Sequence, residues 1–339
     1  GYFFYDSKKS GGVTVSHLRF GDTPIRSTYL INKANFVACH CPSYVTKYDM
    51  VEDLVPGGTF LLNCIWTPDE LDTELPAKLK RYIAENNINL YIINGIKIAE
   101  EVGLSGRAST ILQSAFFKIS GILPEEKAIE LMKAAATTSC SRKGEAVVKS
   151  NHDGIDRGAQ EVIKVDVPES WKTAVDDEVE PEIKTDREDM KKFVKEILHP
   201  VDHLRGDSLP VSAFVDRADG EYPQGSAAFE KRGIANDVPE WNPATCAQCN
   251  RCSMVCPHAV IRPVALNDEE LAAAPEATKS VKLKVVPTLN FAIIISALDC
   301  TGCGSCANVC PTHSLTMKPI ASQLSSQPVF DALVDTGVK

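Results

Sequence analysis

The last third of the chain contains two copies of one cysteine pattern, C-x2-C-x2-C-x3-C, and a proline follows each copy. Zinc is usually bound by separate pairs of cysteine or histidine, and His258 and His313 follow the prolines without such a spacing. A disulfide framework is typical of small secreted domains, whereas this chain has 339 residues. The pattern therefore indicates iron–sulfur ligation by Cys246, Cys249, Cys252, Cys256, Cys300, Cys303, Cys306 and Cys310.

The same spacing holds two [4Fe–4S] clusters in bacterial-type ferredoxins, where the fourth cysteine of each run ligates the cluster of the other run. A chain with two such clusters close together passes single electrons. We expect apolar shielding from Val255, Val260, Ile261 and a strand at 293–295, and N–H donors to sulfur at the turns of Gly302 and Gly304. The predicted ligand sets are Cys246, Cys249, Cys252 and Cys310 for one cluster, and Cys300, Cys303, Cys306 and Cys256 for the other.

Composition narrows the class of protein. The net charge of −9 argues against nucleic acid as a partner, and the longest apolar run, Phe291 to Leu298, is too short to span a bilayer. We interpret the four cysteines outside the runs as free buried thiols. Free thiols suit a reducing compartment, which would be the cytoplasm, or an anaerobic organelle in a eukaryote. The chain starts at Gly1, and we interpret it as a piece of a longer polypeptide. The four cysteines are Cys39, Cys41, Cys64 and Cys140.

The first part of the chain alternates between expected strands and helices, which argues for an α/β domain with a mainly parallel sheet over residues 1–160. The helix from Ser109 to Ser120 is predicted to have Ser109 as its N-cap, and Pro124 to open the next helix in its first position. The expected strands lie at 13–18, 34–39, 59–65 and 88–93, and a further helix at 79–84.

The composition changes near residue 160. We expect an acidic, extended linker over 161–238 with one helix from Asp186 to Leu198, then an α+β ferredoxin-like domain over 239–325. An Ala-rich insertion between the cysteine runs, Asn267 to Ala277, is expected to be helical. Residues 326–339 are interpreted as the start of a connector.

Three segments carry a resemblance to a known family. The run from Gly1 to Gly21, continued by Pro24 to Leu30, resembles the start of the gamma-type domain of pyruvate:ferredoxin oxidoreductases. Glu230-Lys231-Arg232-Gly233 resembles the signature of the family's small EKR linker domain, and the two-cluster domain follows in the family's order. We expect the EKR charges to be structural and to form ion pairs that pin the linker.

The resemblance implies oxidative decarboxylation of pyruvate to acetyl-coenzyme A and CO2, with electrons passed to ferredoxin or flavodoxin. It also implies a homodimer, and thiamine diphosphate, Mg and a third [4Fe–4S] cluster in parts of the polypeptide outside this chain. No catalytic residue is assigned within these 339 residues. The alternative is an electron-transfer subunit without catalysis of its own, and a thiamine motif in the parent sequence would decide between the two.

The gamma-type domain of the family helps bind coenzyme A. The resemblance therefore makes the Ser-Lys-Lys-Ser-Gly-Gly loop at residues 7–12 a candidate for contact with its phosphates. Lys8, Lys9 and Ser10 offer charge, a hydroxyl and approachable backbone to phosphate, although the same loop taken alone fits a solvated turn. Arg107, with Ser109 at the following helix start, is a second candidate, or else a surface ion pair. Asn151 is a third candidate, or else a turn residue.

Overall fold

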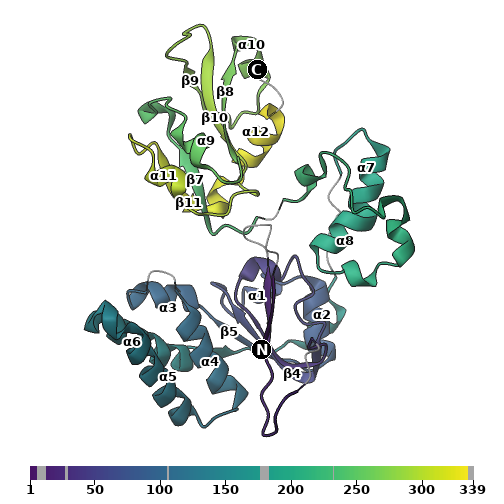
Figure 1. The fold of residues 1–339 in the computed structure, drawn as a ribbon, viewed down its shortest axis with the longest axis vertical. Coiled ribbons are helices and arrows are strands. Elements are labelled where there is room, and N and C mark those ends of the chain that lie inside the picture. Colours follow the sequence, from purple (N-terminus) through teal and green to yellow (C-terminus); the bar gives the residue numbers. More distant parts are fainter. Residues whose placement is uncertain (6–12, 27–29, 105–106, 176–182, 232, 335–339) are drawn as a thin grey trace. The chain divides into compact units, whose positions relative to one another are not determined.

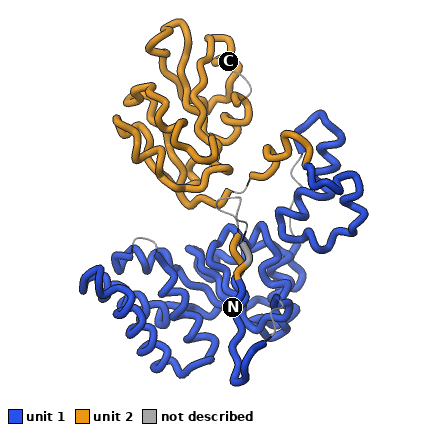
Figure 2. Tube along the Cα trace, in the orientation of Figure 1, with its two compact units in different colours: residues 1–2, 16–221 blue, residues 3–15, 222–339 orange. Residues whose placement is uncertain are grey.

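A computed structural model describes residues 1–5, 13–26, 30–104, 107–175, 183–231 and 233–334. The chain divides into two compact units, one of residues 1–2 and 16–221 and one of residues 3–15 and 222–339 (Figure 2). Strands β1 (Tyr2–Tyr5) and β2 (Thr14–His17) form a two-stranded sheet of their own. None of the helices in the described ranges is long and apolar enough to cross a membrane.

The first unit is built on a four-stranded sheet in the order β3-β4-β5-β6, of which β4 and β5 are labelled in Figure 1. Strands β3 (Ala34–Cys39), β4 (Leu54–Asn63) and β5 (Asn89–Ile93) are parallel, and the short β6 (Ile163–Lys164) runs antiparallel to β5. The expected strand at 59–65 therefore begins earlier and ends earlier than its sequence pattern indicated. The mainly parallel sheet is as predicted.

Alternating side chains of β4 face two different apolar cores, since successive residues of a strand point to opposite faces. Phe60 and Leu62 pack in a core with α2 (Ala77–Glu85), and Leu61 packs in a core with α4 (Ser109–Ser120). Helices thus cover both faces of the sheet, as an α/β domain requires. The remaining helices of this layer are α1 (Leu71–Glu74), α3 (Gly95–Glu101), α5 (Glu125–Cys140) and α6 (Glu145–Gln160).

Two predicted helix starts are corrected. The N-cap position of α4 belongs to Ala108, so Ser109 is its first helical residue and makes no cap hydrogen bond. Pro124 is itself the N-cap residue of α5, with extended backbone, and Glu125 is the first helical residue. Helix α6 lies very close to α4 at Gly158. A Cβ at this position would collide with the Ile111 carbonyl oxygen, so the close approach requires glycine.

The predicted linker at 161–238 is less extended than expected. A 3-10 turn, Glu169–Thr173, buries Trp171, whose indole N–H donates to Asp72 at 2.8 Å. The expected helix at 186–198 begins at Glu188 and continues further, as α7 (Glu188–Phe193), a π-helical turn (Val194–Leu198) and α8 (His199–Asp202). Short 3-10 turns follow at Gly206–Ser208, Val211–Arg217 and Ser226–Phe229.

The second unit contains two small antiparallel sheets. One pairs β7 (Asp237–Trp241) with β11 (Leu315–Pro319), and the other has the order β8-β10-β9. Between β8 and β9, α10 (Asp268–Ala273) covers the first part of the predicted helical insertion, which was expected to extend to Ala277, and has a capping box from Asn267. The other elements are β8 (Ile261–Leu266), β9 (Val281–Lys282), β10 (Asn290–Ile295), α9 (Arg251–Val255), α11 (Ser305–Asn308), α12 (Ser326–Leu333) and 3-10 turns at Pro243–Thr245 and Ile320–Gln323.

Helix α12 occupies the sequence where a connector was expected. Its residues Val329, Phe330 and Leu333 share an apolar core with Leu266 of β8 and Ile294 of β10. The residues up to Leu333 are therefore packed as part of the second unit.

Candidate iron–sulfur centres

The two cysteine runs fold with the same local backbone. Gln248 and Gly302, each two residues after the first cysteine of its run, have positive φ of 60° and 71°. Asn250 and Gly304, four residues after that cysteine, have 57° and 73°. The residues three after the last cysteines, Ala259 and His313, repeat the match with 53° and 49°. The sequence repeat is thus also a conformational repeat, and it includes non-glycine residues held in a conformation that they seldom adopt.

These turns direct backbone N–H groups at sulfur. The N–H of Gln248 donates to Cys246 Sγ and that of Gly302 to Cys300 Sγ, both at 3.4 Å. The N–H of Ser314 donates to Cys310 Sγ at 3.2 Å. The sulfur contact predicted for the Gly302 turn is present, and hydrogen bonds of this kind stabilise negative charge on a thiolate or on the group that it ligates.

The eight cysteines line two small cavities. Each cavity takes three cysteines from one run and the fourth from the other run. This is the grouping that the crossed ligand sets require. The first cavity is lined by Cys246, Cys249, Cys252 and Cys310, and the second by Cys300, Cys303, Cys306 and Cys256.

The rest of the lining contains both apolar and polar residues. Val260 and Ile261, 3% and 1% exposed, line the second cavity as predicted, and Ile293 lines the first. Val255 lines neither cavity and is 38% exposed, so its predicted shielding role is not seen. Sequence reasoning missed wall residues from β7 and β11, which are Trp241 and Leu315 at the first cavity and Pro239 and Met317 at the second.

Burial divides the thiols chemically. Cys306 is 7% exposed, and burial raises its pKa to about 11. Burial also raises the pKa of Cys300, whereas contact with the Ser305 hydroxyl lowers the pKa of the exposed Cys303. A buried thiol with a raised pKa keeps its proton at neutral pH, so a metal that binds it must displace that proton.

The donor set suits a cluster. A single metal ion needs ligands that converge on one point, and among the described residues no three His, Cys, Asp or Glu side chains are placed in that way. A four-iron cluster takes one thiolate at each corner, so its cysteines surround a space. Each cavity provides four cysteine sulfurs, apolar side chains among its walls, and backbone N–H groups directed at sulfur.

The candidates for coenzyme A are placed only in part. Lys8, Lys9 and Ser10 lie outside the described residues. Arg107 and Ser109 are both exposed at the start of α4, and the Arg107 Nε donates to the Leu104 carbonyl at 3.0 Å. Asn151 is buried within α6, where its amide nitrogen donates to the Val147 carbonyl at 2.8 Å, so it is a helix residue and not part of a turn.

The other cysteines fit the interpretation of free thiols. All twelve cysteines of the chain are free of disulfide bonds. Cys39 and Cys64 are buried, and burial raises their pKa values to about 12 and about 11. Cys41 and Cys140 are only partly buried, which differs from the expectation.

Comparison with known proteins places these features together. Three family models match in succession: pyruvate ferredoxin/flavodoxin oxidoreductase over residues 1–161, the EKR domain of unknown function over 177–235, and a 4Fe-4S dicluster domain over 245–315. The three matches follow one another along the chain in this order.

Curated relatives match almost the whole chain. The chain is 47% identical over 324 residues to pyruvate-flavodoxin oxidoreductase of Enterobacter agglomerans, covering 95% of this chain and 27% of that protein. It is 46% identical over 332 residues to the Klebsiella pneumoniae pyruvate-flavodoxin oxidoreductase, with 97% and 28% covered. Pyruvate:ferredoxin oxidoreductase of Moorella thermoacetica is 46% identical over 329 residues, with 94% and 27% covered. The chain thus spans little more than a quarter of these relatives, and almost its whole length is similar to pyruvate-flavodoxin and pyruvate:ferredoxin oxidoreductases.

Proposed function

We propose that this chain relays electrons through two [4Fe–4S] clusters, as part of an enzyme that oxidises pyruvate to acetyl-coenzyme A and CO2. The observation that carries the proposal is the pair of cavities, each lined by four cysteines drawn from both runs. When bound, the clusters supply one-electron redox chemistry. The chain's own part is to hold them by eight thiolates, to exclude water with apolar walls, and to adjust their potentials with N–H groups at sulfur.

The catalytic reaction itself is assigned to other parts of the enzyme. The names of the relatives support pyruvate as the substrate and flavodoxin or ferredoxin as the acceptor. Thiamine diphosphate, Mg and a third [4Fe–4S] cluster would lie outside these 339 residues, and we propose a homodimer in the cytoplasm. No catalytic residue is proposed within this chain.

Metal analysis tests the two-cluster proposal directly. Protein purified without oxygen should contain about eight iron atoms and about eight acid-labile sulfides per chain, as two [4Fe–4S] clusters require. Replacing both exposed cysteines, Cys249→Ser with Cys303→Ser, provides a variant with one weakened ligand at each site. Stoichiometric zinc without visible charge-transfer absorption would overturn the proposal.

We also propose that the family domain at residues 1–161 contacts coenzyme A through Lys8, Lys9, Ser10, Arg107, Ser109 and Asn151. The support is the presence of phosphate-binding groups, lysine, serine and glycine, in the loop at 7–12, and the exposure of Arg107 and Ser109 near the start of α4. Asn151 is the weakest member, because its amide nitrogen already bonds within α6.

Lys9→Ala tests this binding in the full enzyme. It should raise the KM for coenzyme A about 10-fold to 100-fold, because a charge-assisted hydrogen bond contributes roughly 1.5–3 kcal/mol. The control Lys118→Ala removes a surface lysine paired with Glu125 in the same domain and should leave the KM unchanged. Loss of pyruvate decarboxylation with an unchanged KM would exclude the phosphate contact.

A further inference from the structure

The segment between β10 and the second cysteine run is held by hydrogen bonds at three backbone groups of Ser296 and Leu298. The N–H of Ser296 donates to the Val260 carbonyl at 2.9 Å, and the N–H of Leu298 donates to Gln327 Oε1 at 2.9 Å. The Leu298 carbonyl accepts from the N–H of Gly233 at 2.7 Å. The next residues are Asp299 and Cys300, so this loop determines where the first thiol of the second cavity lies.

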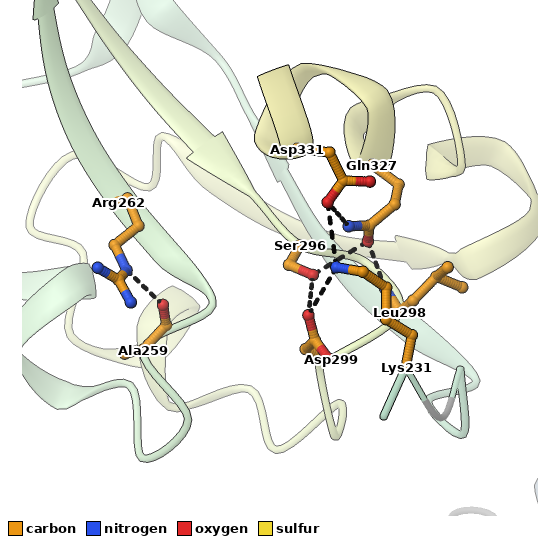
Figure 3. A network of polar contacts seen from close by, with 8 residues as sticks. All are labelled: Lys231, Ala259, Arg262, Ser296, Leu298, Asp299, Gln327 and Asp331. Carbon is orange, nitrogen blue, oxygen red and sulfur yellow. Dashed lines mark hydrogen bonds and ion pairs between the residues drawn. The ribbon is translucent and has the colours of Figure 1, made fainter. Parts of the chain in front are cut away.

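Lys231, from the EKR signature, reaches the same loop (Figure 3). Its Nζ donates to Asp299 Oδ2 at 3.3 Å and to Asp331 Oδ1 of α12 at 3.1 Å. The ammonium also lies 5.7 Å from the centre of the Phe330 ring, within the range of a cation–π contact. The EKR lysine thus joins the loop before Cys300 to α12, and the predicted structural ion pairs are present for this residue.

Neutral polar groups complete the network. Ser296 is fully buried and its hydroxyl contacts Asp299 Oδ2 and Gln327 Oε1. The Gln327 amide nitrogen donates to Asp331 Oδ1 at 2.9 Å. Because Lys231 is only 27% exposed and meets two carboxylates, its removal leaves negative charge that water screens only in part.

We infer that Lys231 is a positioning residue for the second cluster site: it holds the Asp299–Cys300 loop against α12 and offsets the charge of Asp299 beside the Cys300 thiolate. The inference rests on the proposed two-cluster function. It gives a physical role to one residue of the domain of unknown function matched at 177–235. The role concerns the second cluster, since the network holds Asp299, which directly precedes Cys300 of the second cavity.

Charge variants in the full-length protein test this inference by the direction of a redox shift. Lys231→Met adds net negative charge near the second cluster and should shift it about ten-fold toward its oxidised form, which is about 59 mV for a one-electron couple. Asp299→Asn removes negative charge and should shift the same cluster in the opposite direction. Redox titrations followed by magnetic spectroscopy measure both clusters, with Cys249→Ser and Cys303→Ser marking the first and second sites.

Two further variants control the experiment. Lys231→Arg keeps the charge and can donate to both carboxylates, so it should restore the original potential. Lys282→Met removes another lysine of the same unit, paired only at the surface with Asp268, and should leave the second cluster unchanged. Amide hydrogen exchange over residues 296–300 gives a readout without redox chemistry, and we expect it to be about ten-fold faster in Lys231→Met.

Several outcomes would overturn the assignment. Equal shifts at both clusters, or shifts of the same sign in Lys231→Met and Asp299→Asn, would mean that Lys231 supports the fold in general. If Lys231→Met fails to retain iron, the sign of the shift in Asp299→Asn still decides. If the wild-type protein contains about eight iron atoms but the Lys231 and Asp299 variants shift neither cluster selectively, the role of Lys231 is rejected and the two-cluster proposal stands.

Discussion

The two cysteine runs have the same turns but different chemical surroundings. In the first run the left-handed positions are occupied by Gln248 and Asn250, and in the second by Gly302 and Gly304. The second cavity has two buried thiols, Cys300 and Cys306, whereas none of the first run's cysteines is buried to that degree. The comparison teaches that a repeated ligand pattern conserves backbone geometry, while the environment of each site is set by segments outside the pattern.

The crossed grouping of cysteines predicts the largest effect. Cys256→Ala should remove the cluster built by the second run, because Cys256 lines the second cavity, and iron should fall from about eight to about four atoms per chain. Cys310→Ala is the matched variant and should remove the first cluster instead. Iron analysis with magnetic spectra of the reduced protein distinguishes them. Loss of the cluster nearest in sequence would show that the wiring is local.

In cluster-free protein, the exposed Cys303 and the buried Cys306 should differ strongly in their rates of alkylation. At pH 8, alkylation of Cys303 should be at least about 100-fold faster than that of Cys306, because only the thiolate reacts and the pKa of Cys306 is about 11. The rate at Cys306 should rise about ten-fold per pH unit below that pKa. Time-resolved mass spectrometry measures both rates. The contrast should vanish in urea, and its persistence there would mean that burial is not the cause.

Exchanging residues at the positive-φ positions tests whether the two cysteine runs tolerate the same side chains there. Gly302→Gln copies the first run but should destabilise the fold by about 1–3 kcal/mol, because a Cβ there lies 3.0 Å from the Asp237 carbonyl oxygen at positive φ. Gly304→Asn should cost less than about 1 kcal/mol, since nothing lies within 4 Å of that Cβ and Asn tolerates this conformation. Denaturant unfolding measures both. Equal costs would mean that conformation alone, without the contact, decides.

The insertion between the runs should matter least. Asn267→Ala removes the capping box of α10 and should lower the free energy of unfolding by about 1 kcal/mol. Both clusters should keep their spectra and iron content, because α10 supplies no residue to either cavity. Loss of iron in this variant would connect the insertion to the sites and weaken the comparison.

Local patterns predicted the fold best where a single segment decides the outcome. The strand at 34–39 and the helix ending at Ser120 were found at those positions, because apolar periodicity reports burial directly. The prediction of Ser109 as the N-cap of α4 is wrong, since Ala108 occupies that position. Strand β4 begins before its Gly57-Gly58 pair, because Leu54 pairs with Ala34. The register then jumps to Thr59 opposite Phe36, and Gly57 has a positive φ of 76°, so the two glycines form an irregularity within the strand.

The candidate sites show the same division. Cysteine spacing was sufficient to group the eight thiols, whereas wall residues such as Trp241 and Met317 come from strands that only tertiary pairing brings together. The charged run at Lys231 suggested ion pairs, but its partners are 68 and 100 residues away and no local rule identifies them. The coenzyme A residues stay a prediction.

The exchange of the fourth cysteine has a consequence for the order of events during synthesis. The ribosome releases the chain from its amino end, so three thiols of the first cavity emerge with residue 252 while the last one emerges only with residue 310. The second cavity is complete at residue 306. Neither ligand set is therefore complete before the second cysteine run is being translated, and cluster insertion is a late event in the synthesis of the chain.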